Sequence, residues 1–373
     1  MGAKIFKVLL VLFRIAIGGL FIFSGLIKAN DALGFSYKLN EYFDVFKMHW
    51  LEPFSLAIAI FMCALETLLG IMLLLGARIR LTLWLLILML LFFAFLNFYS
   101  GYYNAVTECG CFGDFIIMTP WQEFRNNVIM LVLSIILLIR NKDIGPIFGN
   151  KRVENIFVVI AMIACLAFPL YTYNYLPVKD FRAYKIGTDL YKAIHPQVKY
   201  YYILKNKATG EKHEFEKWPD NWEATWVYDT NRVENLDKDI TPIIGFAMHN
   251  EYGEDYSDEF LQKPGYKFLL VEWDLTKTNK GVQGKINDFA AVCSLNKIEF
   301  AGLTSSDSMT VLNFKKEINV NYPIYTNLDD VPLRTMIRAN PGLILLKDAT
   351  VIEMWHYHSF PSFNDVKEKY FKK

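Results

Sequence analysis

The sequence predicts an α-helical membrane bundle of five transmembrane helices, followed by a small β-rich module and an α/β domain outside the membrane. Three observations support this prediction. Hydrophobic residues make up 53% of the 373 residues and charged residues only 21%, against roughly 45–50% and about 25% in soluble domains. Nearly all the excess hydrophobicity lies before Pro177. From Lys179 onward the composition is that of a soluble protein, so we predict domains at 1–178, 179–262 and 263–373.

A transmembrane helix needs about 20 mostly apolar residues to cross about 30 Å of hydrocarbon. The fourth apolar block is short, but Thr119-Pro120-Trp121-Gln122 carries the N-cap, proline and glutamine of a helix start. Its first two turns are then polar, and either protrude into water or line a polar pocket. The predicted spans contain the apolar blocks Ile5–Ile27, Phe54–Gly76, Leu81–Ser100, Val128–Ile139 and Ile156–Leu176.

The distribution of Lys and Arg among the loops predicts the topology, because cytoplasmic loops are enriched in these residues. The loop Gly101–Thr119 contains neither residue and is expected to face outward. The first segment has no small-x-small cleavage pattern, so we expect it to be retained as a span. We therefore predict a multi-pass inner-membrane protein with a cytoplasmic amino terminus and a periplasmic domain after Pro177. The predicted cytoplasmic segments carry Lys4, Lys7, Arg78, Arg80, Arg140, Lys142, Lys151 and Arg152.

The charge balance limits the possible partners of the chain. Lys and Arg number 39 and Asp and Glu 38, which gives a formal net charge of +1. Such a chain has no basic field to hold a phosphate backbone, so nucleic acid is excluded as a partner. The lipid bilayer is the expected partner of the amino-terminal half.

The outer part begins with a predicted hairpin, Lys199–Lys205 and Lys212–Glu216, followed by a strand at Ala224–Asp229. From Tyr266 the predicted elements alternate between strands and helices and end in a hairpin and a last helix. This order resembles a thioredoxin-like fold, with Asn340-Pro341 where that family places its cis-proline. The family's chemistry needs a cysteine at the start of the first helix, and Leu275–Gly284 has none. We predict a redox-silent domain that docks periplasmic or membrane partner proteins.

The sharpest local signal is Cys109-Gly110-Cys111 in the outward loop. Two cysteines at this spacing lie near the limit of disulfide geometry, and so small a ring removes little chain entropy. A strained bond is more readily reduced, which suits a redox pair. Three alternatives remain: a redox pair, an inert bridge or two free thiols, and a metal site with His49 that lacks an evident fourth ligand. Arg125, at the start of the next helix, would stabilise a thiolate.

The motif Cys-Gly-Cys-Phe-Gly between helices resembles the MauE branch of the DoxX-like membrane proteins. Further similarity lies in the first two spans, at Arg14, Gly18-Gly19, Ser24-Gly25, Lys28 and Glu66. The resemblance covers roughly residues 5–140 and implies disulfide formation in a periplasmic partner and, more loosely, quinone chemistry. With its thioredoxin-like tail, the chain is similar to a group of bacterial inner-membrane proteins.

Two charged residues are predicted inside the membrane. Counted from the cytoplasmic ends of their spans, Arg14 and Glu66 both lie about 14–15 Å deep. An unpaired charge there would cost at least about 2.5–3.5 kcal/mol, so we predict an ion pair between them, as a structural clamp or as a proton relay. Cys63, Cys165 and Cys293 are expected to be buried, and His356 and His358 to be surface residues.

Two functions follow from these patterns. In the first, Cys109 and Cys111 pass electrons from periplasmic thiols to a membrane quinone, and the outer domain presents the partner. In the second, the protein is a non-enzymatic, membrane-anchored scaffold or assembly factor. The Cys-x-Cys motif favours the first, and the absence of a second thiol pair favours the second.

Overall fold

The structure, a computed structural model, describes residues 2–106, 115–116, 118–143, 145–237 and 240–371. The chain divides into two compact units, Met1–Phe181 and Arg182–Lys373. The Cys109–Cys111 motif lies outside the described residues.

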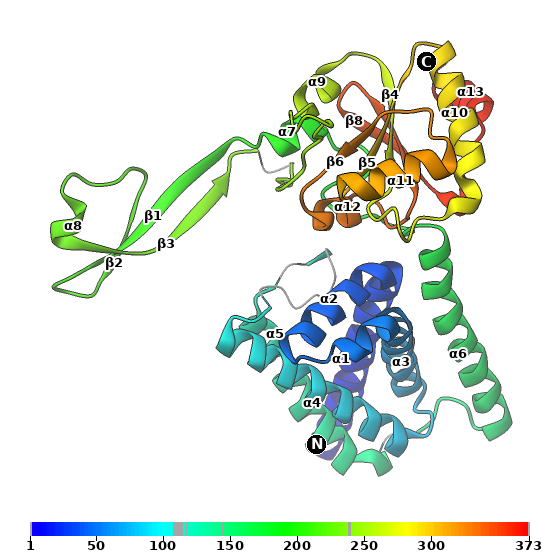
Figure 1. Cartoon of the computed structure of the whole chain (residues 1–373). Helices are drawn as coiled ribbons and strands as arrows, with labels where there is room; N and C mark the ends of the chain where they lie inside the picture. Colours follow the sequence, from blue (N-terminus) through cyan, green and yellow to red (C-terminus); the bar gives the residue numbers. More distant parts are fainter. Residues whose placement is uncertain (1, 107–114, 117, 144, 238–239, 372–373) are drawn as a thin grey trace. The chain divides into compact units, whose positions relative to one another are not determined.

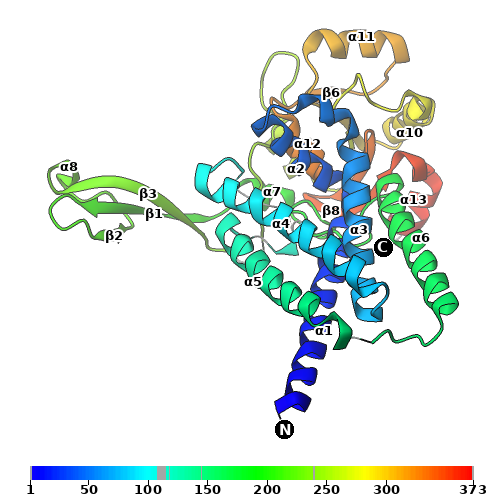
Figure 2. The same ribbon diagram turned by 90° about the horizontal axis from the view of Figure 1, so that it is seen from below.

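The first unit consists of helices (Figure 1 and Figure 2). Five described helices are long and apolar enough to span a membrane, which confirms the predicted five-helix bundle, and the chain is a multi-pass membrane protein. Helix α2, which lies between the first two of them, was not predicted. The helices are α1 (Gly2–Asn30), α2 (Ala32–Val45), η1 (His49–Phe54), α3 (Ser55–Leu75), α4 (Ile79–Tyr103), α5 (Pro120–Ile139), η3 (Asn141–Asp143) and α6 (Lys151–Asn174).

Helix α5 begins where its sequence predicts. The Thr119 hydroxyl accepts a hydrogen bond from the Gln122 backbone N–H, and the Gln122 side chain accepts one from the Thr119 N–H. This reciprocal capping box satisfies two backbone donors that the first turn of a helix leaves unpaired. It therefore fixes the position of the polar first turns of α5.

Helices α1 and α3 pack closely through glycines. A Cβ atom built on Gly70 would lie 2.7 Å from the Gly18 carbonyl oxygen. A Cβ atom on Gly25 would lie 2.7 Å from the Thr67 backbone nitrogen. Small residues allow such close approach between helices in a membrane, and these contacts fix the register of α1 against α3.

The end of α6 lies beside the end of α1. The Thr172 hydroxyl donates to the Ala29 carbonyl over 2.7 Å. The Asn30 amide donates to the Lys179 carbonyl over 2.7 Å and accepts from the Lys179 N–H over 3.1 Å. Since α1 and α6 end at the same side of the bundle, the chain leaves the bundle opposite its amino terminus. A chain that leaves on the side opposite its amino terminus crosses the membrane an odd number of times, which agrees with five spans.

The orientation in the membrane is testable by reporter fusions. Alkaline phosphatase, which is active only outside the cytoplasm, is expected to be active when fused after Asp180 and inactive when fused after Asn141, because the loop containing Asn141 carries Arg140 and Lys142. Reporter activity in cells, normalised to fusion protein level, measures this. The reverse pattern would contradict the predicted topology.

The second unit contains two separate sheets (Figure 1). The first has strand order β2-β1-β3, all antiparallel, which matches the predicted β-rich module. Its strands are β1 (Val198–Asn206), β2 (Lys212–Phe215) and β3 (Trp226–Asn235), with α7 (Leu190–Ile194) before them, α8 (Trp222–Thr225) between β2 and β3, and α9 (Ser257–Gln262) after them.

The second sheet has five strands in the order β6-β5-β4-β7-β8, with β7 antiparallel to β4. This is the predicted thioredoxin-like arrangement, and the Asn340-Pro341 bond is cis as expected. Its elements are β4 (Tyr266–Val271), η4 (Lys280–Val282), α10 (Gln283–Leu295), β5 (Glu299–Thr304), α11 (Ser308–Ile318), β6 (Ile324–Thr326), α12 (Asp330–Met336), β7 (Gly342–Lys347), β8 (Thr350–His356), η5 (Tyr357–Ser359) and α13 (Phe363–Tyr370).

Both faces of the central strand β4 are buried. Phe268 and Leu270 pack in one cluster with residues of α10, α11 and α13, while Leu269 and Val271, on the opposite face, are also fully buried. A strand covered on both faces reads as a continuous apolar run, as Phe268–Val271 does. The α/β domain therefore has a complete core of its own.

Candidate functional site

A buried ion pair joins the first two spans. Lys28, at the end of α1, donates to Glu66 Oε2 of α3 over 2.6 Å, and the two side chains are 1% and 6% exposed. The Lys28 ammonium also lies 4.6 Å from the centroid of the Phe93 ring of α4. Two opposite charges removed from water hold each other, and the face of an aromatic ring also stabilises the cation.

The predicted ion pair between Arg14 and Glu66 is wrong. Arg14 donates to the Leu73 carbonyl over 2.7 Å, to the Leu74 carbonyl and to the Gly145 carbonyl over 3.2 Å. Leu73 and Leu74 belong to the last turn of α3, whose carbonyls have no partner within the helix. Arg14 thus caps the carboxyl end of α3, where a cation also interacts favourably with the helix dipole.

The error has a physical reason. Counting depth from the ends of the apolar blocks assumes that both helices end at the same level. In the structure Arg14 lies level with Leu74, eight residues from Glu66, which corresponds to about 12 Å along the helix. The glycine contacts set this offset, and they leave Lys28 as the cation that reaches Glu66.

A cavity of about 300 Å³ opens inside the bundle next to this pair. Volumes of this size lie at the lower end of those that hold small organic ligands. Its apolar wall comes from α1, α4, α5 and the residue Met118 before α5. The polar part of the lining consists of Ser24, Lys28, Glu66, Glu123, Asn126 and Asn127.

Three of the polar residues in the first turns of α5, Glu123, Asn126 and Asn127, therefore line a pocket, which was one of the two alternatives left open by the sequence. Glu123 and Asn127 are buried, whereas Gln122 and Arg125 are exposed. Asn127 is 7% exposed, and among the described residues its Nδ2 has no hydrogen-bond acceptor. Buried amide donors are nearly always paired, so this atom is suited to bind an acceptor oxygen of a ligand in the cavity.

The cavity lies between the two helices that flank the cysteine motif. Leu90 and Phe93 come from α4, which precedes the motif, and Met118 and Asn127 follow it. The structure does not describe Cys109 and Cys111, so their predicted role stays a prediction. Arg125 is exposed on α5 and does not line the cavity, and its predicted role toward the thiols also stays a prediction.

The other three cysteines are free thiols buried in their units, as predicted. In the α/β domain, burial raises the pKa of the Cys293 thiol to about 12. Reactive cysteines have a low pKa and are accessible, so Cys293 is unsuited to thiol exchange.

A buried carboxyl group follows strand β4 instead of a cysteine. Glu272 is 1% exposed and accepts hydrogen bonds from Thr278 Oγ1 over 3.3 Å, from Tyr322 OH over 3.1 Å and from Gln283 Nε2. Burial raises its pKa to about 7, although the three hydrogen bonds act in the opposite direction. No sequence pattern had singled out Glu272, because a lone glutamate after a strand carries no signal of burial.

The two histidines of the last hairpin differ. His358 is exposed, as predicted, but His356 is 3% exposed, so its expected surface position is wrong. His356 is the last residue of β8, and its Nδ1 accepts a hydrogen bond from the His358 N–H over 3.1 Å. Burial lowers the pKa of His356 to about 4.

Comparison with known proteins places a family similarity on the membrane unit. Residues 6–140 match the family described as "Methylamine utilisation protein MauE". No curated protein matches the sequence significantly.

Solved structures match a different part of the chain. A thiol-disulfide oxidoreductase from Bacteroides fragilis NCTC 9343 is 17% identical, with 33% of this chain and 95% of that chain covered and a TM-score of 0.28. StoA from Bacillus subtilis is 15% identical, with 34% and 98% covered and a TM-score of 0.27. A secreted disulfide oxidoreductase of Mycobacterium tuberculosis is 15% identical, with 30% and 81% covered and a TM-score of 0.25.

Proposed function

We propose that the protein is a membrane thiol oxidoreductase that oxidises Cys109 and Cys111 with a membrane quinone bound in the bundle cavity. The observation that carries this proposal is the cavity, because it combines apolar walls, a buried ion pair and the buried amide of Asn127 between the helices that flank the cysteine motif. The similarity of residues 6–140 to MauE supports it.

The residues of the cavity suit the ring of a quinone, which is apolar with carbonyl oxygens that accept hydrogen bonds. Asn127 Nδ2 offers one donor, and the Lys28 ammonium is a second donor group in the cavity lining. The ion pair with Glu66 holds the Lys28 ammonium in place. Leu20, Phe21 and Leu90 supply apolar surface and exclude water.

The reaction balances in electrons and protons. Cys109 and Cys111 form an S–S bond and release two electrons and two protons. A quinone supplies the oxidant and takes up two electrons and two protons to become a quinol. Glu66 and Glu123 are the carboxylates in the cavity lining that are suited to pass protons. The oxidised pair would then accept electrons from the thiols of a periplasmic partner protein.

A test uses the full-length protein in detergent, reduced and freed of reductant under anaerobic conditions. Added short-chain ubiquinone is expected to be reduced with the loss of two thiols per quinone. Cys109→Ser should abolish this reaction. Asn127→Leu should raise the quinone concentration that gives the half-maximal rate by roughly 10-fold. This is the effect of losing one hydrogen bond of about 1.4 kcal/mol. Asn155→Leu, on the exposed surface of α6, is the matched control.

Two results would contradict the proposal: oxidation of the thiol pair that does not depend on quinone, or an Asn127→Leu variant with an unchanged quinone dependence.

The second candidate is the non-enzymatic scaffold, which the α/β domain favours because Leu275–Gly284 has no cysteine and Cys293 is buried. Full function in cells of both Cys109→Ser and Cys111→Ser would support the scaffold.

A further inference from the structure

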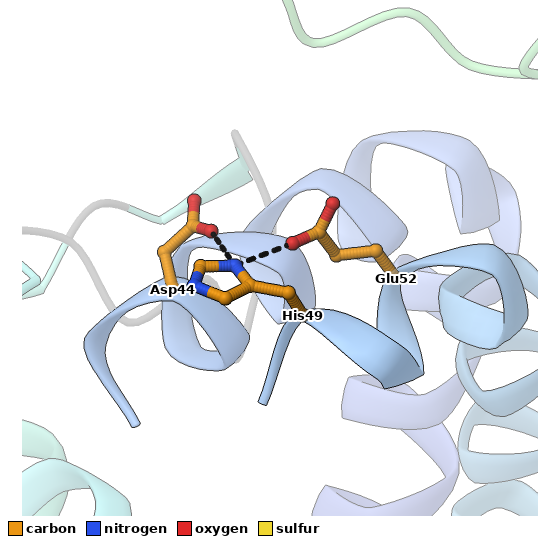
Figure 3. Close-up of side chains that lie close together, drawn as sticks. All are labelled: Asp44, His49 and Glu52. Carbon is orange, nitrogen blue, oxygen red and sulfur yellow. Dashed lines mark hydrogen bonds and ion pairs between the residues drawn. The ribbon is translucent and has the colours of Figure 1, made fainter. Parts of the chain in front are cut away.

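Three side chains of types that can bind a metal ion meet where α2 ends and η1 begins (Figure 3). His49 Nδ1 lies 3.1 Å from Asp44 Oδ1 and 2.8 Å from Glu52 Oε1. The three potential ligand atoms all lie within 4.8 Å of one another. One of the three alternatives from the sequence put His49 in a metal site with Cys109 and Cys111, which lie outside the described residues; among the described residues His49 lies beside two carboxylates.

The local backbone produces this arrangement. Lys47 has a positive φ of 57°, and the Met48 N–H donates to the Phe43 carbonyl over 2.7 Å. This tight turn reverses the chain after α2, so that Asp44 faces the first residue of η1. Glu52, three residues after His49, returns to the same side in the helical turn of η1.

One ring nitrogen faces two carboxylates in this cluster. Both carboxylates face the same ring nitrogen, His49 Nδ1, and a ring nitrogen carries at most one hydrogen. One hydrogen shared between two carboxylates leaves two negative charges close together, whereas a metal ion would bind all three atoms at once.

We propose that Asp44, His49 and Glu52 bind a zinc ion. Nitrogen and carboxylate oxygen are zinc ligands at about 2.0–2.2 Å. Tetrahedral geometry at these lengths puts ligand atoms about 3.3–3.6 Å apart, which is less than about 1 Å beyond the two observed distances. The side chains are 64%, 63% and 41% exposed for His49, Asp44 and Glu52, so they can move by this amount, and the fourth position remains open to water.

The test measures zinc binding by isothermal titration calorimetry on the full-length, metal-free protein in detergent. The parent for these titrations carries Cys109→Ser with Cys111→Ser, which removes the two thiols as competing ligands, and the protein with both cysteines is titrated beside it. We expect one zinc ion per chain. Asp44→Asn should lower the affinity at least 10-fold, and His49→Gln should lower it further. Cobalt(II) bound in place of zinc should give the visible absorption spectrum of an ion with a low coordination number. This absorption should be lost in His49→Gln.

A matched control is His195→Gln. His195 Nε2 lies 2.7 Å from the single carboxylate of Asp258, so it has one acidic partner instead of two. This variant should bind zinc like the parent. Absence of stoichiometric binding in the parent, or equal affinity in the parent and His49→Gln, would overturn the proposal. Binding that requires Cys109 and Cys111 would overturn it as well, without bearing on the quinone reaction.

Discussion

Replacing Lys28 by methionine is expected to destabilise the membrane unit by about 3–5 kcal/mol, because it leaves the Glu66 carboxylate buried without its cation. The pair lies inside the bundle, with the Lys28 side chain 1% and the Glu66 side chain 6% exposed. A loss of this size should lower the melting temperature of the full-length protein in detergent by roughly 10 °C. The double variant Lys28→Met with Glu66→Leu should recover much of the loss, because no buried charge remains.

A matched control for this prediction is Lys38→Met. Lys38 also pairs with a glutamate, Glu41, over 3.0 Å, but these side chains are 29% and 47% exposed. An exposed pair contributes about 0–1 kcal/mol, so this variant should melt within a few degrees of the parent. If the losses of Lys28→Met and Glu66→Leu simply add in the double variant, the two residues are not energetically coupled.

The second large effect is expected at Glu272, whose pKa burial raises to about 7 from a usual 4.5. Below pH 4.5 the Glu272 carboxyl group is protonated in both the folded and the unfolded protein, and its contribution to stability is fully present. This contribution is lost as the pH rises through about 7. The loss amounts to about 3 kcal/mol. Glu272→Gln should remove this loss, since Tyr322 can then donate to Gln283 Oε1, 3.3 Å away.

Hydrogen–deuterium exchange of the β4 amides in the full-length protein measures this effect. At pH 8 the Glu272→Gln variant should show protection factors up to roughly 100-fold above the parent, after correction for intrinsic exchange rates. At pH 4 the two proteins should be equally protected. Equal protection at pH 8 would show that Glu272 is not protonated in the folded domain near neutral pH.

His356 has the opposite effect on the pH dependence of stability, and it provides a comparison within the same domain. Its pKa is lowered to about 4 by burial, so its contribution is present above pH 6.5 and is lost as the pH falls through about 4. Between pH 4.5 and 6.5 the opposite effects of Glu272 and His356 on the free energy of unfolding partly cancel in the parent. In Glu272→Gln only the effect of His356 remains of the two, so the protection factors should rise with pH across this window.

The sequence predicted the order of elements well because both parts of the chain carry strong local signals. Apolar blocks of sufficient length predict spans, and the capping residues of α5 mark its start within one residue. Helix α2 was missed even though Phe35, Leu39, Tyr42 and Phe43 lie on one helical face and are buried, because these apolar residues alternate with polar ones and form no continuous block long enough to predict a span.

The candidate site could be predicted only in part. Lys28 and Glu66 were both recognised through the resemblance of the first two spans, but their pairing depends on the register of α1 against α3, which the lengths of apolar blocks do not determine. The register results from glycine contacts between residues far apart in sequence. The same limit applies to Asp44 and His49, which a tight turn brings together, and to His356, whose burial depends on neighbouring elements.

The close packing of α1 against α3 has a consequence for the tolerance of α1 to insertions and deletions. Arg14, Gly18, Phe21, Gly25 and Lys28 follow one another at spacings of 4, 3, 4 and 3 residues, which places them along a single stripe of the helix. The contacts of Arg14 and Lys28 lie at opposite ends of this stripe, with the glycines between them. One residue inserted between the glycines would rotate one end by about 100° relative to the other. Either the cap of α3 or the ion pair would be lost, so the length of this segment is fixed even though many of its individual side chains face lipid.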